Sequence, residues 1–227
     1  MHSFDCEHIG GSSSNIIDIV FCCDTTGSMS SYISKSIETV HNIIKKMAEL
    51  SVGSTDRSVK FAFVAYKDHC DPKVTLTQPL TDEATVKSFI ATLKADGGGD
   101  GPEAVFDGMN DAVYKANWRE HSMRFMFHIA DAPPHGMEFT GGMADDHPEG
   151  CPCGLKIEKI ASQMKELNIR YKLLKIGSYV NTMASVFKGI IEDFEESELD
   201  SATQLDLKVT EILVRDIKTE EQDILLD

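Results

Sequence analysis

An apolar run from Ile16 to Cys23 passes directly into a polar turn, Asp24 to Ser28, and the turn passes into a helical pattern. An almost uninterrupted apolar run of this length is typical of a strand that is buried on both faces, as in a parallel sheet covered by helices. After the turn, apolar residues recur at steps of three and four and predict a helix with one buried stripe, at Ile33, Ile37, Val40, Ile44 and Met47. Residues 16–47 are therefore expected to form a β–α unit.

The same alternation of strand and helix continues along the chain. Further buried strands are expected over residues 59–66, 123–130 and 170–176, and a brief edge strand over 73–78. Helical patterns lie between them over residues 81–94, 103–116, 155–167 and 183–194. Strands that alternate with helices of this length predict an α/β fold of the Rossmann-like type, with a doubly wound, mainly parallel central sheet and helices on both faces.

The length of 227 residues suits one large domain, which we place at 16–196. Residues 1–15 are expected to form a flexible leader that ends in a Gly/Ser run. Residues 197–227 are acidic and are expected to form a solvated C-terminal extension. A strand or a partner-binding segment is the alternative there, because Leu205, Leu207 and Val209 alternate with polar residues.

The composition excludes several classes of partner. A net charge of −15 disfavours nucleic acid, which is bound by Lys and Arg. No window approaches the roughly 18 apolar residues of a membrane span, and residues 1–14 do not resemble a secretory signal. The six cysteines show no disulfide framework, so a reducing compartment is expected. If Met1 is the native start, these features predict a cytoplasmic protein without a membrane partner.

Acidic turns follow or lie close to three of the expected strands. The first carries Asp24, Thr26 and Ser28, the second carries Asp100 and Glu103, and the third is Asp131. Ligands bind at the carboxyl ends of the strands in open parallel sheets. Carboxylates and hydroxyls are hard oxygen donors that suit Mg²⁺ or Mn²⁺. The alternative for the first turn is helix capping, which Ser, Thr and Asp commonly provide.

This arrangement closely resembles the von Willebrand factor type A domain with its metal-ion-dependent adhesion site. The resemblance rests on the sequence D-T-T-G-S at 24–28, on G-G-G-D-G-P-E at 97–103 and on Asp131 at a strand end. It extends from residue 16 to residue 194. Together with H-I-A-D-A-P-P-H-G from residue 128, these strings are most similar to the A domains attached to atypical alpha-kinases, although no kinase domain fits after residue 194.

The resemblance implies a role for each candidate residue. Asp24, Thr26 and Ser28 would form the first metal loop. Ser28 and one more hydroxyl would bind the ion directly, and Asp24 would bind it directly or through water. Asp131 would hold a metal-bound water. The second loop has Gly101 where the family usually has Thr, so Glu103 is expected to be the ligand, with Asp100 supporting it or holding an adjacent Ca²⁺.

The function that this resemblance implies is binding and not catalysis: the cation would recruit a protein partner through an Asp or Glu side chain. One alternative is metal-assisted hydrolysis of a phosphate ester, although the chain lacks the D-x-D motif and has no evident nucleophile or general base. Another is a scaffold whose metal site is vestigial.

A separate set of possible metal ligands consists of histidines and cysteines in and near the loop over residues 132–154. We consider zinc for His128, His135, His147, Cys151 and Cys153, with His69 and Cys70 elsewhere in the chain. Cys151-Pro152-Cys153 is a C-x-C sequence and a weaker signal than paired C-x-x-C motifs. Ordinary loop residues and a core histidine, His128, are therefore the favoured interpretation.

Overall fold

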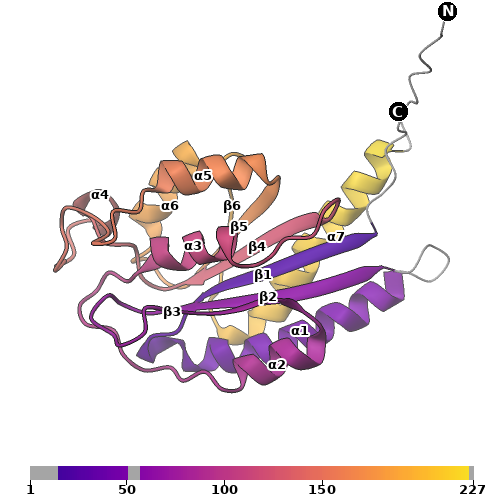
Figure 1. Ribbon diagram of the computed structural model, residues 1–227, viewed down its shortest axis with the longest axis horizontal. Helices are drawn as coiled ribbons and strands as arrows, with labels where there is room; N and C mark the ends of the chain where they lie inside the picture. Colours follow the sequence, from indigo (N-terminus) through magenta and orange to yellow (C-terminus); the bar gives the residue numbers. More distant parts are fainter. Residues whose placement is uncertain (1–14, 51–56, 225–227) are drawn as a thin grey trace, which may run out of the picture.

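The structure is a computed structural model that describes residues 15–50 and 57–224. Its centre is a six-stranded sheet with the strand order β3-β2-β1-β4-β5-β6 (Figure 1). The strands are β1 (Ile16–Asp24), β2 (Ser58–Tyr66), β3 (Thr75–Thr81), β4 (Met123–Ala130), β5 (Ile169–Lys175) and β6 (Glu195–Glu198). All neighbouring strands pair in parallel except β3, which runs antiparallel to β2 at one edge. The predicted α/β fold with a mainly parallel sheet is confirmed.

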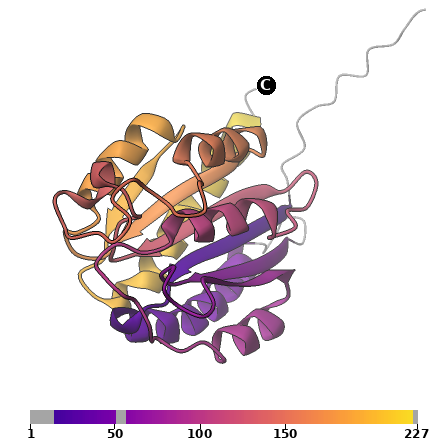
Figure 2. The same ribbon diagram turned by 60° about the vertical axis from the view of Figure 1, so that its left-hand side comes forward.

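Helices cover both faces of this sheet, as Figures 1 and 2 show from two directions. The helices are α1 (Ser30–Leu50), α2 (Glu83–Ile90), α3 (Val105–Tyr114), α4 (Met137–Thr140), α5 (Ile157–Glu166), α6 (Asn181–Ile190) and α7 (Leu205–Ile224). Two short 3₁₀ turns, η1 (Gly27–Met29) and η2 (Ala202–Gln204), precede α1 and α7. The helix expected over 81–94 is shorter, because Asp82 caps α2 by accepting a hydrogen bond from the Thr85 N–H.

The alternation of side chains along β1 divides the core into two layers. Ile17, Ile19 and Phe21 face a cluster that includes residues of α1, α2 and α7. Val20 and Cys22 face the opposite cluster, to which α3, α5 and α6 contribute. Because both faces of β1 are buried, its sequence is apolar rather than alternating, apart from Asp18 and the terminal Asp24. The buried Asp18 carboxylate forms an ion pair with Arg119 at 2.6 Å.

The prediction of a solvated extension over 197–227 is wrong, because most of this segment forms the packed helix α7. Helix α7 packs against α1, and its buried side chains belong to the same core as the sheet: Leu205, Val209, Ile212, Leu213 and Ile217. These positions have helical spacing, whereas Leu207 is 66% exposed and has no part in a strand-like pattern. The charged run at 195–198 is an edge strand and not a helix end, because β6 pairs with β5.

Two further expectations have different outcomes. Apart from Asn15, the leader expected over 1–15 lies outside the described residues. His128 is a fully buried core residue, as expected, and its two ring nitrogens lie 2.8 Å from the Tyr66 hydroxyl and 2.6 Å from the Tyr171 hydroxyl. Burial lowers the pKa of His128 to about 3, so this histidine is neutral.

Candidate metal centre at the carboxyl edge of the sheet

Two strand ends bring Asp24 and Asp131 together. Strands β1 and β4 are parallel neighbours with Cys23 opposite Ile129, so Asp24 ends one strand where Asp131 follows the other. The two carboxyl groups lie close enough for the charge of Asp131 to help raise the pKa of Asp24, an effect that adds to that of burial. The fold therefore brings these two distant acids to the same edge of the sheet, as predicted.

The second loop is held beside the same edge by backbone contacts. The Glu103 N–H donates to the Pro133 carbonyl oxygen at 2.9 Å, and Glu103 forms an isolated parallel bridge with Pro134. The Ala104 N–H donates to the Lys67 carbonyl oxygen at 2.8 Å, just beyond the end of β2. These contacts bring Glu103 between the ends of β2 and β4, and its side chain is buried there.

The first turn orders its own side chains around Asp24. Asp24 Oδ1 accepts hydrogen bonds from the Thr26 backbone N–H at 2.8 Å and from the Thr26 hydroxyl at 2.7 Å. Thr26 is the N-cap residue of η1, but its side chain makes no capping hydrogen bond. Ser28 lies exposed in η1, one turn beyond Asp24. The hydroxyls of this turn are therefore not committed to capping.

Three buried carboxylate oxygens have no hydrogen-bond donor within the part of the chain that the structure describes: Asp24 Oδ2, Glu103 Oε2 and Asp100 Oδ1. A buried polar atom without a partner is costly and calls for a ligand that supplies one. Gly98 closes the space beside them, since a Cβ on Gly98 would lie 3.0 Å from Glu103 Oε1 and 3.5 Å from Thr26 Cβ. The donor set is oxygen throughout, which fits Mg²⁺ or Mn²⁺.

The electrostatics of the cluster are those of crowded carboxylates. Burial raises the pKa of Asp24 to about 7, and the charge of Asp131 adds to this effect. Burial also raises the pKa of Glu103 to about 9, and four neighbouring carboxylates add to it, those of Asp24, Asp68, Asp71 and Asp131. Without a cation, some of these acids therefore hold protons at neutral pH. A divalent ion would reverse the balance and favour the ionised forms.

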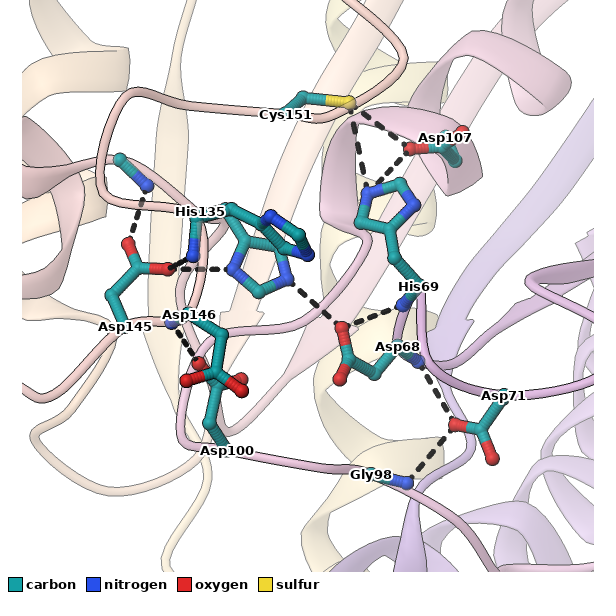
Figure 3. A network of polar contacts seen from close by, with 12 residues as sticks. Asp68, His69, Asp71, Gly98, Asp100, Asp107, His135, Asp145, Asp146 and Cys151 are labelled. Carbon is teal, nitrogen blue, oxygen red and sulfur yellow. Dashed lines mark hydrogen bonds and ion pairs between the residues drawn. The ribbon is translucent and has the colours of Figure 1, made fainter.

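Asp100 lies in a neighbouring cluster rather than against Asp24. Its carboxylate, that of Asp68 and a ring nitrogen of His135 lie within 4.8 Å of one another. Asp100 Oδ2 accepts a hydrogen bond from the Asp146 N–H at 2.6 Å, as Figure 3 shows. His135 bridges two acids, with Nε2 2.9 Å from Asp68 Oδ1 and Nδ1 2.8 Å from Asp145 Oδ1.

Two acids of this edge were not predicted as site residues. Asp68 and Asp71 follow the end of β2, and both contribute to the raised pKa of Glu103. The Asp71 carboxylate accepts hydrogen bonds from the backbone N–H groups of Asp68 and Gly98, which joins this loop to the glycine-rich segment (Figure 3). The signal was present in the sequence, since both acids lie within five residues after a predicted strand, but no motif marks them.

Comparison with known proteins agrees with this geometry. A family model described as von Willebrand factor A domain matches residues 18–151. The chain belongs to the von Willebrand factor A domain family. The matched region contains the ends of β1 and β4 and the loop that carries Asp100 and Glu103, and therefore every candidate ligand of Mg²⁺.

Two curated relatives contain a similar vWA segment. The alpha-protein kinase vwkA of Dictyostelium discoideum is 36% identical over 160 residues, which are 70% of this chain and 25% of that protein. A putative ariadne-like RING finger protein of Acanthamoeba polyphaga mimivirus is 29% identical over 123 residues, or 53% of this chain and 11% of that protein. The chain thus spans a quarter or less of the length of these relatives.

Solved structures share the vWA fold at low sequence identity. The pilus adhesin SpaC of Lactobacillus rhamnosus GG superposes with a TM-score of 0.57 at 12% identity, covering 92% of this chain and 30% of SpaC. A von Willebrand factor type A protein from Catenulispora acidiphila superposes with a TM-score of 0.54 at 14% identity, covering 88% of this chain and 42% of that one. Within residues 15–50 and 57–224, none of the helices is both long and apolar enough to cross a bilayer.

Proposed function

We propose that this vWA domain is a metal-dependent protein-binding module. Mg²⁺ or Mn²⁺ would be held by Asp24, Thr26, Ser28 and Glu103, with Asp131 holding a metal-bound water. The cation would then accept an Asp or Glu side chain of a partner protein. The observation that carries the proposal is the convergence of buried carboxylate oxygens without donors, Asp24 Oδ2 and Glu103 Oε2, at the edge where β1 and β4 end.

The charge of the cluster favours this role over binding without metal. Several carboxylates at one edge of the sheet would repel an acidic partner group, because like charges in a buried site disfavour one another. A divalent cation offsets that repulsion and leaves room for one more anionic ligand. An adjacent Ca²⁺ is the second part of the proposal, and Asp100 with Asp68 would supply carboxylate ligands for it.

A metal contact needs surrounding surface to make a stable interface. Met137 and Tyr179 are 72% and 68% exposed, and they belong to the segments that follow β4 and β5. They would add apolar contact area at the edge of the sheet where the acids lie. SpaC, which shares this fold, is a pilus adhesin, and this is consistent with a binding role. Kinase activity belongs to the full-length relative vwkA, and we do not propose it, or any other catalysis, for this chain.

The test of the metal step is isothermal titration with Mg²⁺ and Mn²⁺. The wild-type chain should release or absorb heat on binding, and Asp24→Ala should abolish it. Glu192→Ala is the matched control, because Glu192 is an acid at the opposite edge of the sheet, near Asn15 and Arg124. Absence of heat in the wild-type chain, or heat that survives Asp24→Ala, would support the vestigial-site alternative.

The test of the recruiting step uses the Mn²⁺-loaded chain and glutarate as a probe. A carboxylate that enters the coordination sphere displaces metal-bound water, which lowers the relaxation rate of the solvent protons. An unchanged relaxation rate at saturating glutarate would contradict carboxylate recruitment. Turnover of p-nitrophenyl phosphate with Mg²⁺ by the wild-type chain, but not by Asp24→Ala, would instead support the phosphate-ester hydrolase alternative. The cytoplasmic location inferred from the sequence stays a prediction.

A further inference from the structure

A second cluster of metal-ligand side chains lies outside the candidate centre. His69 comes from the loop between β2 and β3, Asp107 comes from α3, and Cys151 comes from the long loop after β4. Figure 3 shows the three side chains pointing toward one another. Cys151 is 82 residues from His69 and 44 residues from Asp107, so the fold alone brings them together. None of the three is a proposed ligand of Mg²⁺.

The distances between the three ligand atoms are those of a tetrahedral zinc site. Cys151 Sγ lies 3.7 Å from His69 Nε2 and 3.3 Å from Asp107 Oδ2, and the last two atoms are 3.3 Å apart. With Zn–S of about 2.3 Å and Zn–N or Zn–O of about 2.0 Å, a tetrahedron has edges of about 3.5 Å from sulfur and about 3.3 Å between nitrogen and oxygen. One ion therefore fits over this triangle without rearrangement of the backbone.

Cys153, two residues beyond Cys151, offers a fourth ligand. Its thiol lies near Asp107, although it is not among the three ligand atoms that come within 4.8 Å of one another. The side chain is exposed, so it can turn toward an ion that lies over the triangle. The Gly154 N–H donates to the Cys151 carbonyl oxygen at 2.9 Å, and Gly154 has a φ of +70°. Residues 151–154 therefore form a tight turn that includes both cysteines.

Cys151 and Asp107 are already in direct contact, since the Cys151 thiol donates a hydrogen bond to Asp107 Oδ2 at 3.3 Å. Burial and the charge of Asp107 raise the pKa of this thiol to about 12, so without a metal it keeps its proton. A zinc ion would take the place of this proton, because metal binding deprotonates a thiol ligand. The set of two sulfurs, one nitrogen and one oxygen is softer than the all-oxygen set beside Asp24 and favours zinc over Mg²⁺ or Ca²⁺.

We propose that His69, Asp107, Cys151 and Cys153 form a structural Zn²⁺ site. Four protein ligands close the coordination sphere, so the ion would have a structural and not a catalytic role. It would join the loop after β4 to α3 and to the turn that carries Asp68, and it would hold that loop in place next to the candidate Mg²⁺ centre. The proposal is independent of the proposed function, because it uses none of the Mg²⁺ ligands.

The first experiment measures metal content and affinity on the whole chain. Purified without chelators, the wild-type chain should contain one equivalent of zinc by mass spectrometry of the metals. Cys151→Ser and His69→Ala should each lower zinc affinity by about 10–100-fold or more, since even outer-shell partners are worth that much. Cys70→Ser is the matched control, because Cys70 is an exposed thiol next to His69 and outside the cluster.

Asp24→Ala separates this proposal from the proposed function. It should lose Mg²⁺ binding and keep zinc, whereas Cys151→Ser should lose zinc and keep Mg²⁺ binding. A wild-type chain that binds no zinc would overturn the zinc site. So would zinc affinity that Cys151→Ser leaves unchanged, or that Cys70→Ser lowers equally.

Spectroscopy identifies the ligands. With Co²⁺ in place of zinc, the wild-type chain should show the bands of tetrahedral cobalt and a sulfur-to-cobalt charge-transfer band. Cys153→Ser should weaken that band by about half, because the number of thiolate ligands falls from two to one. An unchanged band would overturn the assignment of Cys153 as the fourth ligand.

Zinc X-ray absorption of the wild-type chain needs no variant, and it therefore covers the case in which a variant does not fold. It should show sulfur at about 2.3 Å and nitrogen or oxygen at about 2.0 Å. A first shell without sulfur would overturn the site.

Discussion

Replacing Glu103 by Gln tests the central electrostatic argument, because it keeps the shape of the side chain and removes its charge. Glu103 is buried among acids, and its pKa is about 9 against an ordinary value of 4.5. In the absence of metal the folded chain therefore keeps a proton on Glu103 at pH 7 to 8.5. The unfolded chain does not, since its Glu103 is ionised throughout this range.

The expected effect follows from this difference in bound protons. When the native state binds one more proton than the unfolded state, the free energy of unfolding falls by about 1.36 kcal/mol for each pH unit. A group with a raised pKa in the folded chain thus stabilises most at low pH, and the contribution is lost as the pH rises toward 9. Between pH 7.0 and 8.5 the loss due to Glu103 is about 1.5–2 kcal/mol.

Urea denaturation at pH 7.0 and pH 8.5 in excess EDTA measures this loss. The wild-type chain should lose about 1.5–2 kcal/mol more than Glu103→Gln over this interval, since the amide cannot ionise. The comparison of the two chains cancels the titration of other groups, including His135, whose pKa is raised by hydrogen bonds to Asp145 and Asp68 although burial opposes this. With saturating Mg²⁺ the excess slope of the wild-type chain over Glu103→Gln should disappear, because the cation favours the carboxylate.

Two results would refute the reasoning. Equal pH slopes for the wild-type chain and Glu103→Gln in EDTA would show that Glu103 is not a protonated buried acid. An excess of the wild-type slope over that of Glu103→Gln that persists in saturating Mg²⁺ would show that the cation does not contact Glu103.

The remaining predictions concern the core and the glycine-rich loop. Leu213→Ala in α7 should lower the free energy of unfolding by about 2–5 kcal/mol in urea denaturation, whereas Leu207→Ala on the exposed side should change it by less than about 0.5 kcal/mol. Equal effects would contradict the packing of α7 into the core. Gly98→Ala should weaken Mg²⁺ binding in calorimetry, since its Cβ would press on Glu103. Gly142→Ala, also at positive φ but with open space around its Cβ, should cost about 1–2 kcal/mol of stability without weakening Mg²⁺ binding.

The central strands β1, β2, β4 and β5 could be predicted from the sequence because most of their residues are buried, whereas the partly exposed edge strand β6 was missed. The run from Ile16 to Cys23 is apolar at every position except Asp18, so its ends are recognisable, and the acids Asp24 and Asp131 stand directly at such ends. Helix α7 was missed because its burial depends on the face of α1, which lies far away in the chain. Local alternation at residues 205–209 mimicked a strand, and only the packing distinguishes the buried Leu205 from the exposed Leu207.

The site was predictable only where a motif or a strand end marks it. Asp68 follows β2 by two residues without a family motif, and its approach to His135 depends on the course of the long loop. The contact of His69 with Cys151 joins residues 82 positions apart, and no local pattern encodes it. The C-x-C sequence is a weak signal by itself, because the other two ligands proposed for zinc would come from α3 and from the loop after β2.

The position of the C-terminal end of α7 affects how this domain can be joined to other polypeptide. Glu220 and Glu221, near the end of α7, pair with Arg170 at the start of β5 and with Arg57 just before β2. Ile16, at the start of β1, lies at this same edge. Polypeptide attached at either end of the domain, as in relatives several times longer, would therefore depart from the side opposite Asp24. A tether on that side keeps the acidic edge facing outward, free to approach a second molecule.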